Sequence, residues 1–224
     1  MVVLMVLLTF ALCIAVDYWL NRRERGMVSE PKVVRKRVPV AFTEVPVVEG
    51  YRVPAGLNYH PGHTWAWIED VETVRVGMDD FARRLVGLIS RVELPKVGEW
   101  VRQGATGLTV HRNGLRAQMV SPVEGEVVDV NRDLAENPGA VHEDPYGKGW
   151  LFAVRTPDLK QGLNNLVPPG AVGAWMGGAA RALRFRVHNR VGLVYQDGGE
   201  PVEDVVSELG EERWQELTKA FFLT

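Results

Sequence analysis

The stretch from residue 97 to residue 130 constrains the fold more than any other part of the chain. At its centre, Asn113-Gly114 lies between two runs that alternate apolar and polar residues, 108–112 and 115–120. Asn-Gly favours a two-residue type I′ turn, because both positions need a positive φ. A further turn at 121–125 precedes another strand-like run. We therefore expect a small β module with a projecting hairpin whose tip is Asn113-Gly114.

Several ordered motifs surround this hairpin: HTWAWIED at 63–70, VRVGMDDFARRLVG at 74–87, VELPKVGEWV at 92–101, SPVEGEVVDVN at 121–131 and HEDPYGKGW at 142–150. In this order they resemble the H protein of the glycine cleavage system, a lipoyl-carrier family. The resemblance implies a mainly β domain at 59–167, of the lipoyl/H-protein-like barrel-sandwich hybrid type with short helices.

The same resemblance implies a lipoyl-bearing lysine at the hairpin tip, in a motif of the E-S-V-K-A type. Counting back seven residues from Ser121 leads to Gly114, and the motif's glutamate falls on His111. Lipoate is attached through an amide bond to a lysine amine, and no lysine occurs between Val97 and Gly147. Because Gly114 occupies the lipoyl-lysine position, we expect no lipoate and no other cofactor.

Two interpretations of the tip follow. In the first, Asn113 and Gly114 simply close a hairpin well. In the second, His111, Arg112 and Arg116 turn the tip into a cationic docking surface for a partner subunit, with Asn113 and Gly114 at its end.

The bulk composition of the chain is that of an ordinary globular protein. Its 224 residues allow one or two domains, with 46% hydrophobic and 24% charged residues. A formal net charge of −2 gives no case for nucleic acid as the main partner. With Cys13 as the single cysteine, an intrachain disulfide and a cysteine-based metal cluster are excluded.

The N-terminal segment predicts a membrane anchor. Residues 1–16 carry no charge, and a helix over residues 1–20 would span roughly 30 Å, the thickness of a bilayer core. Tyr18 and Trp19 lie where an interfacial aromatic belt belongs, and Arg22, Arg23 and Arg25 follow on the basic side. We expect a single-pass protein of the inner (cytoplasmic) membrane, with its N-terminus outside and its soluble domain cytoplasmic. A cleaved signal peptide is the alternative, but no lysine or arginine precedes Arg22.

Two further regions flank the predicted domain. Residues 21–58 are basic and contain prolines at regular spacing, which predicts an extended linker without long helices. Residues 168–224 predict a mostly helical extension. In this extension we expect helices at 174–187, 202–209 and 211–223, the last with an apolar stripe of Trp214, Leu217 and Phe221.

Candidate chemical groups outside the hairpin all have structural explanations. His60 and His63 suggest a metal site, but no acid or cysteine stands at ligand spacing, so we expect none. Asp79 and Asp80 precede a short predicted helix, where capping explains them without catalysis. We find no phosphate loop, nucleophile elbow or zinc-protease helix, and expect no enzyme activity.

Three hypotheses about function remain open. The first is a non-lipoylated, membrane-anchored H-protein relative that acts as a structural or docking module among the protein subunits of a membrane complex, for example a respiratory or other redox assembly. The second is a true lipoyl carrier of a glycine cleavage-type system. The third is a sensor or binding module for a small lipoate-like or acyl ligand.

Overall fold

A computed structural model of the chain describes residues 45–191 and 210–224. All of them belong to one compact unit, Val40–Thr224. The predicted span at 1–20, with Tyr18, Trp19, Arg22, Arg23 and Arg25, lies outside these residues, as do residues 21–44 of the predicted linker and the helix expected at 202–209. Among the helices that the structure describes, none is both long and apolar enough to cross a membrane.

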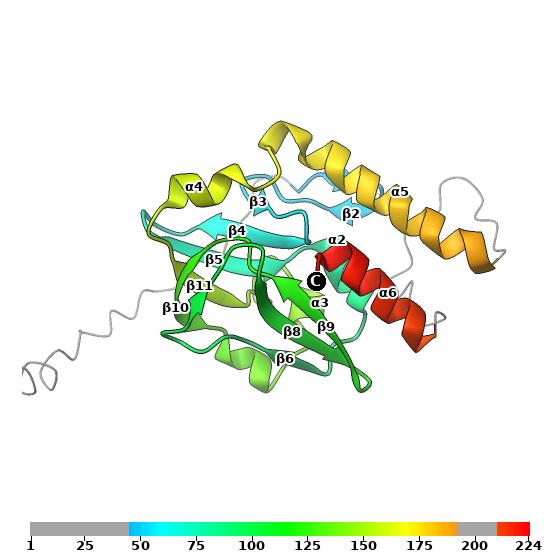
Figure 1. Ribbon diagram of the computed structural model, residues 1–224, viewed down its shortest axis with the longest axis horizontal. Coiled ribbons are helices and arrows are strands. Elements are labelled where there is room, and N and C mark those ends of the chain that lie inside the picture. Colours follow the sequence, from blue (N-terminus) through cyan, green and yellow to red (C-terminus); the bar gives the residue numbers. More distant parts are fainter. Residues whose placement is uncertain (1–44, 192–209) are drawn as a thin grey trace, which may run out of the picture. The chain divides into compact units, whose positions relative to one another are not determined.

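The larger sheet has six strands in the order β3-β4-β5-β11-β10-β7 (Figure 1). In the same order their bounds are Asn58–Tyr59, Thr64–Ile68, Thr73–Met78, Phe152–Arg155, Gly125–Val130 and Trp100–Val101. Trp65 is buried, pairs with Gly77 in the neighbouring strand and donates from its indole to the Met78 carbonyl at 2.8 Å. A Cβ on Gly77 would overlap the Trp65 ring, so only glycine leaves room for it.

A smaller sheet contains the hairpin and has the strand order β6-β8-β9, with bounds Arg91–Glu93, Thr106–Arg112 and Leu115–Val120. Leu108, Val110, Ala117 and Met119 turn their side chains into the core, which explains the alternating pattern of the two long strands. The predicted hairpin, and with it a mainly β fold with short helices, is confirmed.

Residues 47–58, which the sequence assigned to the extended linker, belong to the folded unit instead. They include a third antiparallel pair, β1 (Val47–Val48) with β2 (Tyr51–Arg52), joined by Glu49-Gly50 at positive φ. Tyr51, Val53 and Leu57 are buried in the main core. The proline-based prediction missed this segment because isolated apolar residues between turns carry no periodicity.

Helix α2 (Asp80–Val86) begins at the aspartates that the sequence assigned to its cap. The Asp79 carboxylate accepts from the Ala82 backbone N–H at 2.8 Å, and Gly87 ends the helix at φ 74°. Phe81 and Leu85 are buried, but Leu88, which continues their three- and four-residue spacing, is 70% exposed. The helix stops before Leu88, so the 3.6-residue periodicity no longer applies there.

Four short helical turns lie in the connections between the longer elements that the structure describes. They are η1 (Arg132–Ala135), α3 (Ala140–Glu143), α4 (Leu159–Asn164) and η2 (Pro169–Ala171). Asp144 closes the loop after α3 by accepting from the backbone N–H groups of Gly147 and Lys148. The acidic loop at 142–147 is therefore held by hydrogen bonds from backbone N–H groups to the Asp144 carboxylate.

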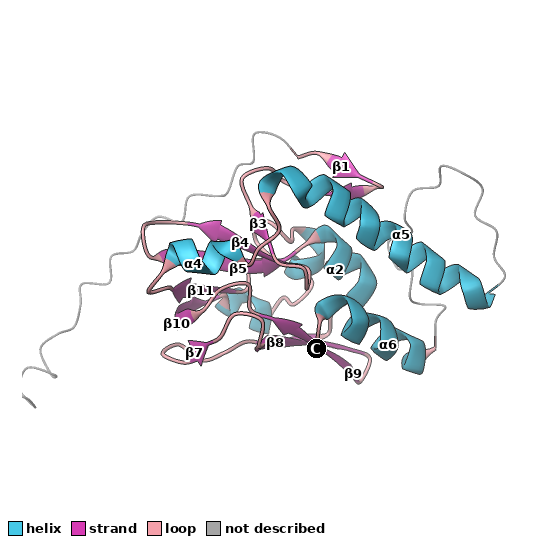
Figure 2. Cartoon of the chain, turned by 45° about the horizontal axis from the view of Figure 1, so that its top comes forward, coloured by secondary structure: helices cyan, strands magenta, loops and turns pink. Residues whose placement is uncertain are grey.

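The described part of the C-terminal extension is helical and packs on the domain (Figure 2). Helix α5 (Val172–Val191) buries Met176, Ala180 and Leu183. Helix α6 (Glu211–Phe222) packs against β9 and α2. Of its predicted stripe, Trp214 and Leu217 are buried, whereas Phe222 is more buried than the expected Phe221.

Candidate functional site

The tip of the β8–β9 hairpin has the geometry that Asn-Gly requires. Asn113 has φ 47° and Gly114 φ 82°, so both central residues are left-handed, as in a type I′ turn. The register pairs Arg112 with Leu115 and His111 with Arg116 on either side of the turn. The structure thus brings the five predicted tip residues together at one end of the hairpin, with Asn113, Gly114 and Arg116 exposed.

The three cations of the tip differ in their surroundings. His111 is paired in register with Arg91 of β6, and its Nε2 lies 3.3 Å from a carboxylate oxygen of Glu93. Arg91 forms an ion pair with the same carboxylate. His111 is therefore partly buried beside an acid that already has a cationic partner, and it contributes less to an exposed cationic surface than the sequence suggested.

Arg112 also faces the protein rather than the solvent. Its Nη1 donates to the Val86 carbonyl at 2.9 Å, at the C-terminal end of α2, where a cation is favoured by the helix dipole. The Trp214 indole N–H lies 3.4 Å from the same carbonyl. Arg112 thus fastens the hairpin to α2, and among the three cations Arg116 is the one whose side chain is exposed.

The lysines that flank the module lie away from the tip. Lys96 is in the β6–β7 connection, where its backbone N–H donates to Glu99 Oε2 at 2.9 Å. Lys148 lies in the loop between α3 and β11. Since no lysine occurs between Val97 and Gly147, the strands β8 and β9 and their turn offer no primary amine.

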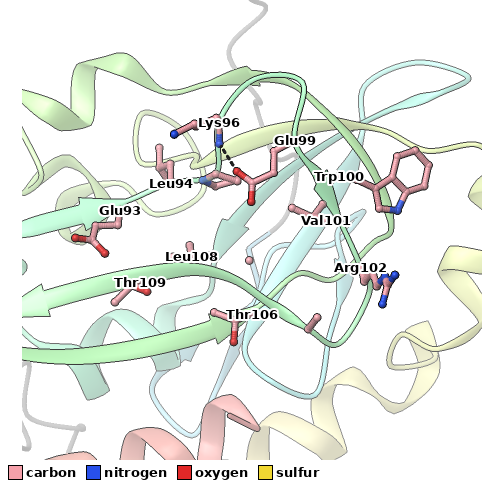
Figure 3. Close-up of a pocket in the computed structure, with 13 residues that line it drawn as sticks. Glu93, Leu94, Lys96, Glu99, Trp100, Val101, Arg102, Thr106, Leu108 and Thr109 are labelled. Atoms are coloured by element: carbon pink, nitrogen blue, oxygen red, sulfur yellow. Dashed lines mark hydrogen bonds between the residues drawn. The ribbon is translucent and has the colours of Figure 1, made fainter.

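A groove lies beside the hairpin, between the chain at 93–102 and strand β8 (Figure 3). Its volume is about 550 Å³, within the size range of small-molecule sites. Buried Val101 and Leu108 contribute apolar lining, and Glu93, Lys96, Glu99, Arg102, Thr106 and Thr109 contribute polar lining. Trp100 lines the groove and is 52% exposed. The sequence did not identify the residues that line this groove, and Trp100 on a short edge strand was the one available signal.

His63 and Asp79 form a buried pair below the C-terminal helices. Their Nδ1 and Oδ2 atoms are 2.8 Å apart. The His63 ring is stacked between Phe81, at a centroid distance of 4.1 Å, and Trp175, at 4.8 Å. Asp79 also caps α2 with its other oxygen. Both carboxylate oxygens of Asp79 thus have structural partners, and this pair connects β4, α2 and α5.

Asp80 is enclosed by arginines, not exposed for chemistry. Its carboxylate lies 2.5 Å from Arg83, 3.3 Å from Arg84 and 3.5 Å from Arg52. The Tyr146 hydroxyl accepts from the Asp80 backbone N–H and donates to the Arg52 carbonyl. Burial raises the pKa of Tyr146 well above its ordinary value. The predicted paired acids therefore have separate roles, a helix cap and a buried ionic network.

His60 serves as a hydrogen-bond acceptor. Its Nδ1 accepts from the Gly62 backbone N–H at 3.0 Å, which requires an unprotonated nitrogen. Burial lowers the pKa of His60 to about 4. In the part of the chain that the structure describes, no group of three or more metal-ligating side chains is clustered.

Comparison with known proteins places residues 57–174 in one family model, the glycine cleavage H-protein. The chain is 39% identical over 117 residues to the glycine cleavage system H protein of Xanthomonas campestris pv. campestris, a match that covers 52% of this chain and 88% of that protein. The H protein of Xanthomonas oryzae pv. oryzae is 40% identical with the same coverage. A crystal structure of the H protein from Mycobacterium marinum is 28% identical with a TM-score of 0.49, covering 56% of this chain and 99% of that chain.

Proposed function

The chain belongs to the glycine cleavage H-protein family, and from this premise we propose that it is a non-lipoylated, non-catalytic member that acts as a membrane-anchored docking subunit. Its setting would be a multi-subunit membrane complex, such as a respiratory or other redox assembly. The domain would hold or position other protein subunits and would not carry a chemical group between them.

The observation that supports this proposal is the chemistry of the hairpin tip. A lipoyl arm needs a primary amine at the end of the hairpin, and the turn is built from Asn113 and Gly114 at positive φ. Neither residue has an amine side chain, and a shifted alignment finds no lysine anywhere from Val97 to Gly147. The scaffold is kept, whereas the attachment group is missing.

The proposed docking surface is the exposed end of the hairpin. Arg116 is exposed there, and Leu88, which follows α2, is exposed as well. Leu88 is close in sequence to Ser90, whose N–H and hydroxyl both donate to the His111 carbonyl. Arginine is among the residue types that protein interfaces favour.

Crosslinking in native membranes tests the docking role. We expect a photo-crosslinker placed at Arg116 to capture a defined partner subunit, identified by mass spectrometry. A crosslinker at Lys160, an exposed residue of α4, serves as the matched control. If both positions capture the same proteins, or neither captures any, the tip is not the interface.

The membrane anchor is a separate part of the proposal. It is supported by the uncharged sequence 1–16 and the arginines at 22, 23 and 25. We expect the full chain to stay in the membrane pellet after alkaline carbonate washing, and the domain to be protected from protease added to intact spheroplasts. Release by carbonate would contradict the anchor, and digestion in spheroplasts would contradict the cytoplasmic orientation.

A second candidate function rests on the groove beside β8. Its volume of about 550 Å³ and its mixture of apolar and charged lining suit a small ligand with an apolar chain. Titration of the full chain with lipoamide would change the fluorescence of Trp100 if the ligand enters the groove. No heat in calorimetry and no fluorescence change would exclude lipoamide as the ligand.

The hypothesis of a lipoyl carrier predicts a covalent adduct on the protein isolated from its native membrane. Intact mass spectrometry distinguishes it from the docking subunit, because the carrier would show a lipoyl or octanoyl addition.

A further inference from the structure

One face of helix α5 is exposed to solvent. The buried side of the helix consists of Met176, Ala180 and Leu183. On the opposite side, Arg181, Ala182 and Phe185 are all exposed. The exposed fractions are 63% for the Arg181 side chain and 67% for Phe185, and the two residues are one helical turn apart.

Helix α5 carries positive charge without acidic residues to balance it. Its sequence VGAWMGGAARALRFRVHNRV contains four arginines and no acidic residue. Glu49, in the turn between β1 and β2, lies 3.5 Å from Arg181 and 2.7 Å from Arg184. Because the Arg184 guanidinium hydrogen-bonds to Glu49 and lowers the pKa of that carboxyl, the acid stays ionised near neutral pH. The two arginines and this one acid leave a net positive charge.

The neighbouring β1 adds exposed apolar side chains to this surface. A Cβ added to Gly177 of α5 would lie 3.7 Å from the Val48 side chain and 3.8 Å from the Glu49 side chain, and β1 lies alongside the helix (Figure 2). Val47 of β1 is 62% exposed, and Val45, the first described residue, is exposed too. The described chain therefore begins beside α5.

We propose that this surface, comprising Arg181, Ala182, Arg184, Phe185 and Val47, docks on an anionic lipid bilayer. Exposed arginines can bind lipid phosphates through paired N–H groups, and Phe185 can enter the boundary between headgroups and acyl chains.

The sequence that precedes the described residues is also basic. Between residues 22 and 37 it contains seven lysines and arginines but only two acids, Glu24 and Glu30. A basic segment of this composition would be attracted to the same anionic surface. The docking of α5 goes beyond the anchor proposed above and does not depend on it, since a basic aromatic face can bind lipid without a span.

The experiment uses the full chain in a Cys13→Ser background, with Ala182→Cys carrying an environment-sensitive fluorophore. Val71→Cys, at the 87% exposed turn between β4 and β5, is the matched control. Each labelled protein is mixed with vesicles of phosphatidylcholine alone or of phosphatidylcholine with phosphatidylglycerol. Circular dichroism verifies that both variants are folded.

We expect the label at 182 to shift to the blue and become protected from an aqueous quencher on vesicles with phosphatidylglycerol only. The label at Val71 should stay accessible on both. High salt should reverse the effect, and Arg181→Glu should weaken vesicle binding at least about fivefold for each unit of charge changed.

Three results would overturn the proposal. They are an exposed label at 182 on anionic vesicles, equal protection on neutral vesicles, and protection that rises with protein concentration without lipid, which would indicate a second copy on this face. The anchor is read separately, from retention of the protein on the vesicles after a carbonate wash. Failure of the anchor and failure of the α5 surface are therefore distinguishable.

Discussion

The covered flank and the exposed tip of the β8–β9 hairpin are held by different forces. Along the flank, α6 buries Trp214, Leu217 and Phe222 against the domain, and Phe222 contacts the segment at Gly62. At the tip, Asn113 and Gly114 are exposed and contribute only their turn geometry. Since the stabilising contacts lie away from Asn113 and Gly114, these two residues can change with little effect on the fold. The scaffold can thus form without an amine side chain at its turn.

The largest expected effect lies on the flank, at Trp214. Replacing this fully buried indole by alanine removes its packing and its contact with the Val86 carbonyl, which should lower the free energy of unfolding by about 3–5 kcal/mol. Urea denaturation measures the change. The exposed Glu212 on the same helix, changed to alanine, is the control. A loss for Trp214→Ala no larger than that of the control would mean that α6 does not hold the hairpin.

Stability of the flank should also depend on pH through His60. Its pKa is about 4 in the folded chain, below the ordinary 6.5, so between these values the unfolded state binds more protons. Stability should be full above pH 6.5 and fall by up to about 3 kcal/mol as the pH is lowered to about 4. Protonation would also break the bond from the Gly62 N–H, beside Val120 and Phe222.

Comparison with His60→Asn isolates this effect from other titrating groups. The asparagine can still accept from the Gly62 N–H through its side-chain oxygen but does not titrate. We expect the variant to lose stability less steeply between pH 6.5 and 4. Identical slopes for the two proteins would show that His60 is not the responsive group.

At the tip, a smaller effect is expected from Gly114→Ala. Since φ at Gly114 is 82°, a side chain there should cost about 1 kcal/mol without disturbing any neighbour, because nothing lies within 4 Å of its Cβ position. Gly178→Ala, in the helical part of α5 with equally open space, should instead stabilise by about 0.5–1 kcal/mol. Thermal denaturation compares the two variants. A change in stability of the same sign for both would contradict the turn geometry.

The smallest effect on stability is expected for Arg116→Glu. An exposed charge change away from buried contacts alters unfolding free energy by at most about 0.5 kcal/mol. The same substitution should reduce recovery of crosslinked partner several-fold, whereas Lys160→Glu should leave it unchanged. Unaltered recovery with Arg116→Glu would remove the tip from the docking account.

Features with strong local signals were predicted from the sequence. Asn113-Gly114 identified its turn because few residue pairs tolerate two positive φ values, and Asp79 identified the start of α2 because its side chain satisfies a free backbone N–H. The alternation at 108–112 and 115–120 predicted which side chains face the core.

Features that depend on distant contacts were missed. The sequence does not reveal that Arg112 bonds to Val86, because this pairing depends on how the hairpin lies on α2. The residues that line the groove at Trp100 were not identified for the same reason, since its walls come from separate strands. Residues 47–58 were assigned to a linker because two-residue strands carry no readable pattern. Contacts between elements, rather than the elements themselves, limited the prediction of the site.

The central claim is that this H-protein scaffold carries no lipoyl group. Intact mass spectrometry of the chain, isolated from cells supplied with lipoate, tests it most directly. The double variant His111→Glu/Gly114→Lys, which restores the two tip residues that the family resemblance implies, shows whether the cells can modify the hairpin. We predict the unmodified mass for the natural sequence and a lipoyl adduct for the double variant. A lipoyl or octanoyl adduct on the natural sequence would contradict the account.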